Sequence, residues 1–271
     1  MTIIDLSQPL ENVSHDKDPS IKYINHQKGG NLLGLLILLN DSFIGIIKNI
    51  CLYLLGIRKI TYQDFANNEG LAWEIIKSDS HASTHLDAPY HFSSKTKGKK
   101  SMTIDEVPLH WCISDGVAID VSNIKGNIIS LSDVTNYLDK INYTIKPMDI
   151  VLFHTGASKK WNTQEYPSAH KAIPPDVIKY LSNAGVKIII CDSFTIDEPF
   201  NVMLEKYLLT KSKDTLWPSH KIGAEIEYLH VENATNIDQL LDSPTGYTIS
   251  CLPIKIREGS AGWVRLVAIK K

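Results

Sequence analysis

Three histidines and one aspartate lie within the eleven residues from His81 to His91, with His85 and Asp87 between them. Neutral imidazole and carboxylate are the usual protein ligands of Zn²⁺, Mn²⁺ and Fe²⁺. In an extended segment, side chains two and four residues apart point to the same side, so we expect His81, His85 and Asp87 to converge on one point. Pro89 then turns the chain, and His91 can approach the same point from another direction. The spacing therefore predicts a divalent-metal site.

The simplest alternative is that these are three ordinary histidines in a surface loop. The chain holds ten histidines, so three beside a spaced aspartate in so short a stretch favour a metal site. The hydroxyls of Ser83 and Thr84 are expected to orient the imidazoles by hydrogen bonds. Neither serine nor cysteine lies in a nucleophile motif such as GxSxG, which disfavours covalent catalysis.

A divalent ion at such a site can activate water and polarise a carbonyl group. His91, with an unperturbed pKa of about 6.5, is suited to take a proton from that water and pass it to a leaving nitrogen. The predicted chemistry is the opening of an amide, formamide or lactam bond in a small-molecule substrate.

The composition is that of a globular protein, with 271 residues of which 43% are hydrophobic and 21% charged. A net charge of −2 offers no basic field for phosphates, so we expect no nucleic-acid partner. The four scattered cysteines form no CxxC pair and are typical of a reducing compartment. The first residues show no secretory signal, so a cytoplasmic location is expected.

The segment 32–57 is strongly apolar, but its longest unbroken run is Leu32–Leu39. A membrane span needs about 20 such residues. Helical spacing of Phe43, Ile46, Ile47 and others predicts one or two helices that pack on the body of the protein or on another subunit. A lid over an apolar substrate is a second interpretation, and attachment to a membrane surface is the least favoured of the three.

The rest of the chain alternates between strand-like and helix-like segments and predicts a mixed α/β protein. We interpret residues 1–271 as a single domain in which 27–60 is an apolar, helical insertion. Strands are predicted at Gly70–Lys77, Gly116–Val121, Asp149–Thr155, Val186–Cys191, Ile226–Val231, Tyr247–Ile256 and Trp263–Ile269. Helices are predicted at Ser130–Ile141, with Ser130 or Ser132 as N-cap, and at Pro174–Ala184.

The HxxTHxDxPxH pattern of residues 81–91 resembles the signature of the cyclase family, which includes kynurenine formamidases and isatin hydrolases. That family has HxGTHxDxPxH, so Ser83 stands where glycine is usual. Weaker likenesses follow in the family's order along nearly all of the chain except 27–60. They are Asp5-Leu6-Ser7 with Pro9-Leu10, Asp149–Gly156, Cys191-Asp192-Ser193 with Asp197, His220, Val231-Glu232-Asn233, and Glu258–Val264 with Arg265.

The resemblance implies a swivelling β/β/α domain that forms a homodimer or homotetramer. It also implies the site residues, with Zn²⁺ or Mn²⁺ as cofactor and one or two ions per subunit. These are His81, His85 and Asp87 as ligands of a first ion, and His220 and Glu232 on the other side of the site, where they would hold a second ion with Asp87 bridging. His91 would be the general base, or a metal ligand when two ions are present.

Three functions remain open. The first is a metal-dependent hydrolase of a C–N bond in an aromatic amide, formamide or lactam. The second is a cyclase or dehydratase of natural-product biosynthesis on the same metal scaffold, and the third is a non-catalytic binding protein. His230 and four other histidines have no partner at an informative spacing, so the sequence assigns them no role.

Overall fold

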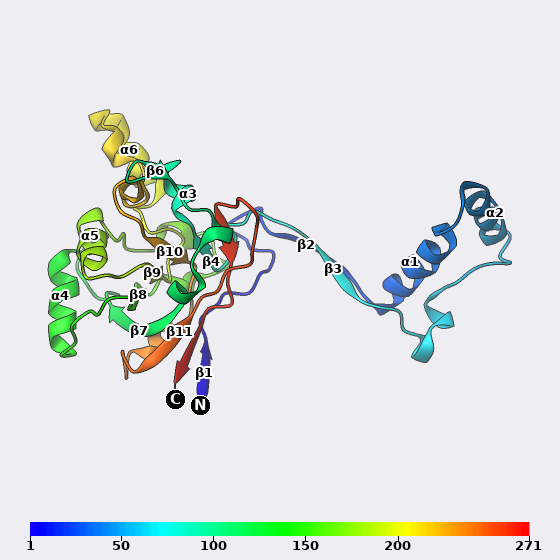
Figure 1. Ribbon diagram of the computed structural model, residues 1–271, viewed down its shortest axis with the longest axis horizontal. Coiled ribbons are helices and arrows are strands. Elements are labelled where there is room, and N and C mark those ends of the chain that lie inside the picture. The colour runs from blue at the N-terminus through cyan, green and yellow to red at the C-terminus, as the bar shows by residue number, and fades with distance from the viewer. Residues whose placement is uncertain (271) are drawn as a thin grey trace. The chain divides into compact units, whose positions relative to one another are not determined.

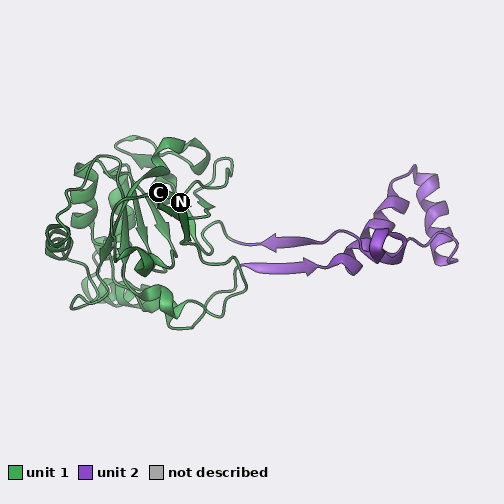
Figure 2. Cartoon of the chain, turned by 90° about the horizontal axis from the view of Figure 1, so that it is seen from below, with its two compact units in different colours: residues 1–18, 79–271 green, residues 19–78 purple. Residues whose placement is uncertain are grey.

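In the computed structural model, which describes residues 1–270, the chain divides into two compact units. One unit combines residues 1–18 with the chain from 79 onward, and the other comprises residues 19–78 (Figure 2). The metal-site motif lies in the first unit.

The first unit is built on a nine-stranded sheet of order β1-β13-β11-β7-β8-β9-β10-β4-β12. Figure 1 labels most of its strands. Strands β7, β8, β9 and β10 run parallel to one another, and the other neighbours pair antiparallel. The strands are β1 (Thr2–Asp5), β4 (His85–Asp87), β7 (Ile113–Asp120), β8 (Ile150–His154), β9 (Ile188–Cys191), β10 (Leu229–Glu232), β11 (Tyr247–Ser250), β12 (Ala261–Trp263) and β13 (Val267–Lys270). A separate pair, β5 (Lys95–Thr96) and β6 (Lys99–Lys100), forms a small ribbon.

Both faces of the central strands are buried, as expected for parallel strands covered on each side. In β8, Ile150 and Leu152 belong to one hydrophobic core, and Val151 and Phe153 belong to a second. This alternation follows from the two-residue repeat of a strand. It gives the sheet two distinct faces, and the face toward the second core is the one that carries the site.

Helices α4 (Leu131–Lys140) and α5 (Pro175–Asn183) contribute Val134, Leu138, Val177, Ile178 and Leu181 to the second core. Ser130 caps α4, accepting the Asp133 N–H in a capping box. The remaining helices of this unit are α3 (Pro89–Phe92), α6 (Phe200–Thr210) and α7 (Pro218–Lys221).

The unit of residues 19–78 contains a two-stranded ribbon and two helices. They are β2 (Ser20–Ile24), β3 (Trp73–Lys77), α1 (His26–Leu39) and α2 (Phe43–Leu54). Phe43, Ile44 and Leu54 are each more than three-quarters exposed in the single chain. Among the described residues, no helix combines the length and apolar character that a membrane crossing requires.

The mixed α/β prediction is confirmed, and the predicted strands and helices mostly match within a few residues. The prediction of one continuous strand at Trp263–Ile269 is wrong, because residues 264–266 separate β12 from β13. β12 is at one end of the sheet order and β13 is the second strand from the other end, so the sheet must curl for three residues to connect them. Tyr247–Ile256 is a strand only as far as Ser250.

Candidate metal centre

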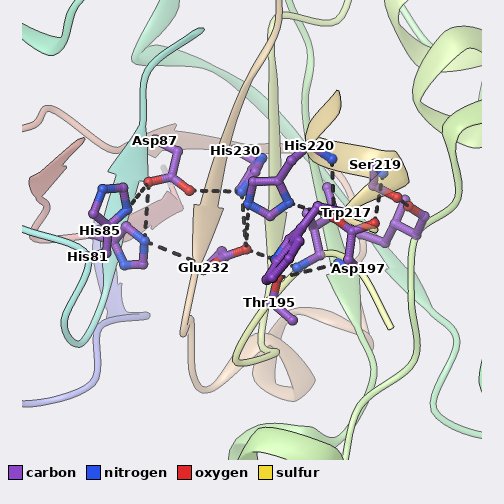
Figure 3. A network of polar contacts seen from close by, with 12 residues as sticks. His81, His85, Asp87, Thr195, Asp197, Trp217, Ser219, His220, His230 and Glu232 are labelled. Carbon is purple, nitrogen blue, oxygen red and sulfur yellow. Dashed lines mark hydrogen bonds and ion pairs between the residues drawn. The ribbon is translucent and has the colours of Figure 1, made fainter. Parts of the chain in front are cut away.

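Two antiparallel strands bring four site side chains together. In the register of β4 and β10, Asp87 lies opposite His230 and His85 lies opposite Glu232. The intervening Leu86 and its partner Val231 point to the other face and are fully buried in the first core. The four polar side chains therefore project from one face of the sheet, where Figure 3 shows them as a connected network.

His81 reaches the same point from a turn. The expectation that it shares one extended segment with His85 and Asp87 is wrong, because β4 begins only at His85 and the residues before it form turns and bends. Ser83 breaks the extended path with a φ of 56°, in the left-handed region that favours glycine. Glycine, which is usual at this position in the family, adopts a positive φ without steric cost, and Ser83 must adopt the same φ with a side chain present.

The left-handed turn gives the Ser83 carbonyl a role in the site. This oxygen accepts hydrogen bonds from His85 Nδ1 (2.9 Å) and from the Asn233 side-chain amide (2.9 Å). The hydroxyls of Ser83 and Thr84 bind backbone carbonyls instead, so their predicted contact with the imidazoles is wrong. Because Nδ1 of His85 is occupied, its Nε2 is the atom left for a metal.

We expect Ser83→Gly to be more stable than Ser83→Ala by about 1 kcal/mol, because glycine carries no penalty of roughly 1–2 kcal/mol at this φ. Both variants lose the hydroxyl's hydrogen bonds to the carbonyls of Gln8 and Pro9, a loss of about 1 kcal/mol. Chemical denaturation of the three proteins measures the difference. Equal stability of the glycine and alanine variants would contradict a strained turn.

His220 is oriented by Asp197. The buried Asp197 carboxylate accepts the backbone N–H groups of Ser219 (2.7 Å) and His220 (3.2 Å), and the His220 Nδ1–H at 2.6 Å. This leaves His220 Nε2 directed at Glu232, with 3.9 Å to its Oε1. Glu232 Oε1 also accepts the Ile196 N–H at 2.9 Å. A carboxylate that fixes the tautomer of a histidine in this way is typical of metal ligands.

Asp87 is the centre of the cluster. Its Oδ1 lies 2.7 Å from His81 Nδ1 and 3.3 Å from His85 Nε2, and its Oδ2 lies 3.0 Å from His230 Nε2. Glu232 lies beside it, with Oε1 3.1 Å from His230 Nε2 and Oε2 3.7 Å from His85 Nε2. The sequence-predicted residues are thus brought together, although their roles as ligands stay predictions.

These donors fit a divalent cation. Asp87 is fully buried, yet within residues 1–270 neither of its oxygens has a hydrogen-bond partner, and neither has His85 Nε2. The nitrogens beside Asp87 are close enough to bond but are not aligned for it, as expected when several donors face one point between them. A buried carboxylate without hydrogen bonds is costly unless a cation compensates it.

The charges of the cluster are those that a cation requires. Burial alone would raise the pKa of the Asp87 carboxyl, but the imidazoles of His85, His230 and His81 hold that pKa well below its usual range. Burial opposes ionisation of Glu232 as well, yet His230 lowers its pKa to about 2. The two carboxylates in turn overcome burial and raise the pKa of His230 to about 10. Both carboxylates are therefore ionised at neutral pH.

His91 lies on α3 at the exposed side of the cluster. Its ring centroid is 4.1 Å from that of His81 and 5.4 Å from that of His220. Desolvation lowers the pKa of His91 to about 4; the Asp87 carboxylate opposes this shift, and the neighbouring imidazoles add to it. His91 is therefore a neutral base at physiological pH, free to accept a proton.

Two residues of the cluster lacked a role in the sequence-based prediction. His230 was assigned none, and Asp197 was noted only as part of a weak family likeness. The available signal was the His230-x-Glu232 spacing, which places both side chains on one face of a strand. Nothing local in the sequence marks Asp197 as the partner of His220, because 23 residues separate them.

The chain is similar in sequence to proteins of known description. A family model described as "Putative cyclase" matches residues 4–198. The kynurenine formamidase of Geobacillus thermodenitrificans is 27% identical over 197 residues, which cover 72% of this chain and 78% of the relative. That of Bacillus cereus is 24% identical over 187 residues, covering 69% and 75%.

Solved structures share the fold at low identity. Isatin hydrolase A from Labrenzia aggregata, bound to benzyl benzoate, matches with a TM-score of 0.68 at 17% identity, over 99% of this chain and 93% of that one. Isatin hydrolase A from Ralstonia solanacearum gives 0.69 at 17% identity, over 100% and 92%. With the family match spanning more than half of its length, the chain belongs to the cyclase family.

Proposed function

We propose that the protein is a metal-dependent hydrolase that opens a C–N bond in an aromatic amide, formamide or lactam. The observation that carries the proposal is the buried Asp87 carboxylate, whose two oxygens lack hydrogen bonds within residues 1–270 and face imidazoles on both sides. The relatives described as kynurenine formamidases and isatin hydrolases support the substrate class.

The ligands proposed for the metal are those that the cluster brings together. We propose His81, His85 and Asp87 for one ion and His220 and Glu232 for the other side of the site, with Zn²⁺ or Mn²⁺ as the cation. Such an ion supplies Lewis acidity and lowers the pKa of water from about 15.7 toward roughly 7. The homodimer or homotetramer expected from the family resemblance also remains a proposal.

Residues of the chain transfer the proton and orient the proposed ligands. His91, neutral because its pKa is lowered to about 4, accepts a proton from the attacking water at a ring nitrogen. It then returns that proton to the leaving nitrogen of the opened amide. Asp197 keeps His220 in one tautomer, and the Ser83 carbonyl does the same for His85.

The test is hydrolysis of N-formylkynurenine and of isatin by chelator-stripped protein, before and after Zn²⁺ or Mn²⁺ is restored. We expect turnover to return with the ion and to be absent in His85→Ala, which removes a proposed ligand. Stoichiometric metal uptake without turnover of either compound would contradict the proposal. That outcome would favour the cyclase or dehydratase alternative instead.

A further inference from the structure

His230 occupies a position where the sheet would otherwise carry a core side chain. Its neighbour in the adjacent strand β9 is Ile189, which belongs to the second hydrophobic core. The His230 side chain is nonetheless fully buried, and its ring stacks on Phe92 with centroids 5.0 Å apart and planes at 10°. A polar ring in this place is costly unless its nitrogens are used.

The two carboxylates divide their oxygens between two sides of the cluster. Asp87 turns Oδ1 toward His81 and His85 and Oδ2 toward His230. Glu232 turns Oε2 toward His85 and Oε1 toward His230 and His220. We call the donors on the His81 and His85 side the outer subsite. The inner subsite consists of His220 Nε2, His230 Nε2, Asp87 Oδ2 and Glu232 Oε1.

The inner donors have the spacing of ligands around one ion. His230 Nε2 lies 3.0 Å from Asp87 Oδ2 and 3.1 Å from Glu232 Oε1, and His220 Nε2 lies 3.9 Å from the same Glu232 oxygen. The four residues offer donor atoms that all fall within 4.8 Å of one another. Neighbouring ligands of a tetrahedral zinc are roughly 3.3–3.6 Å apart, given bonds of about 2.0–2.2 Å.

We propose that His230 is a metal ligand, which makes the inner subsite a closed, four-ligand site. This inference rests on the proposed metal-dependent function and deepens it. Structural zinc sites use four protein ligands, whereas catalytic sites keep one position open. The inner ion therefore holds Asp87 and Glu232 in place, while the outer subsite, where His81 is 24% exposed and His91 lies alongside, receives the substrate.

The contact with Asp87 supports a ligand role more than a hydrogen-bonding one. Asp87 Oδ2 has no hydrogen-bond partner in the described chain even though His230 Nε2 is 3.0 Å away. The competing arrangement keeps a proton on Nε2, which then donates to Glu232 Oε1 at 3.1 Å. His230 Nδ1 is buried without a partner in residues 1–270, so no contact of the ring decides whether Nε2 serves as a ligand or as a donor. The experiment must therefore distinguish ligation from hydrogen bonding.

The deciding variant is His230→Gln, whose side-chain amide can still donate to Asp87 or Glu232 but removes the imidazole. Chelator-stripped full-length protein is titrated with Zn²⁺ by calorimetry, and Co²⁺-loaded protein is followed by visible absorption. We expect two ions in the wild type. In the variant the inner ion should bind at least ~100-fold more weakly, because loss of a ligand should exceed the 10–100-fold effect of an outer-shell partner. His154→Gln, at a buried histidine on β8, is the matched control.

Two Zn²⁺ ions bound by His230→Gln with wild-type affinity and an unchanged Co²⁺ spectrum would overturn the proposal. A measurement that needs no variant is ¹⁵N NMR of histidine-labelled wild type with and without Zn²⁺, in which a ligated His230 Nε2 is expected. An Nε2 atom of His230 that keeps its proton after loading also overturns it. Wild type that binds two ions but hydrolyses neither test compound contradicts the proposed function alone. Active wild type with a single ion contradicts this inference alone.

Discussion

Replacing Asp87 with asparagine is expected to remove metal binding and to lower kcat/KM by at least ~10³-fold, because an ion's contribution of several kcal/mol is lost. Asparagine keeps the volume of the buried side chain and removes the charge that faces His81, His85 and His230. Both subsites share this carboxylate, so one substitution affects both. Metal content by elemental analysis, together with hydrolysis of N-formylkynurenine, measures the effect.

The matched control is Asp149→Asn. Asp149 is also buried, but its carboxylate accepts hydrogen bonds from the Tyr143 hydroxyl and the Lys146 N–H. We expect this variant to lose some stability and to keep its metal. Circular dichroism of both variants shows whether they fold. A folded Asp87→Asn protein with wild-type metal content would contradict the central role given to this residue.

The sequence was informative where the geometry of the site is local. His85 and Asp87 are two residues apart in one strand, so the side on which they meet follows from the strand repeat alone. The turn at Pro89 was also local, and α3 begins there. His81 does lie beside Asp87, as the sequence predicts. The predicted reason is wrong, because the left-handed residue Ser83 interrupts the extended segment that the prediction assumed.

The other side of the site depends on pairing between distant segments. β4 and β10 are adjacent in the sheet although more than 140 residues separate Asp87 from His230 in the chain. Single-sequence patterns show the face of a strand but not its neighbour or its register. His220 and Glu232 therefore came from family resemblance, and His230, outside that resemblance, received no role.

The fold, like the site, was predictable from the sequence only where its signals are local. Continuous apolar runs such as those of β8 and β9 predicted buried strands, and the capped segment after Ser130 predicted α4. The order of strands could not be predicted, since β12 and β13 follow each other in the chain yet lie near opposite ends of the sheet order, β12 at one end and β13 second from the other. Sheet order depends on long-range packing, which no local signal records.

His91→Ala is expected to lower kcat by about 10²–10⁴-fold, the usual contribution of a general acid or base. Its side chain is exposed, so the variant should fold and keep its metal, unlike His85→Ala. His110→Ala removes an exposed histidine elsewhere on the surface and serves as the control, with unchanged kcat. The measurement is steady-state hydrolysis at saturating metal. A His91→Ala protein with full kcat would assign proton transfer to another group.

The pH dependence gives an independent check on the same residue. Because the pKa of His91 is lowered to about 4, the base is neutral and competent above that pH and is lost only as pH falls through it. A cation bound nearby lowers the pKa further, since it disfavours a second positive charge. We therefore expect the loss of kcat/KM caused by His91 to lie below about pH 5, rather than near the ordinary histidine value of about 6.5. An acid limb near 6.5 that disappears in His91→Ala would show that the wild-type imidazole titrates normally and that the surrounding cluster does not keep it neutral.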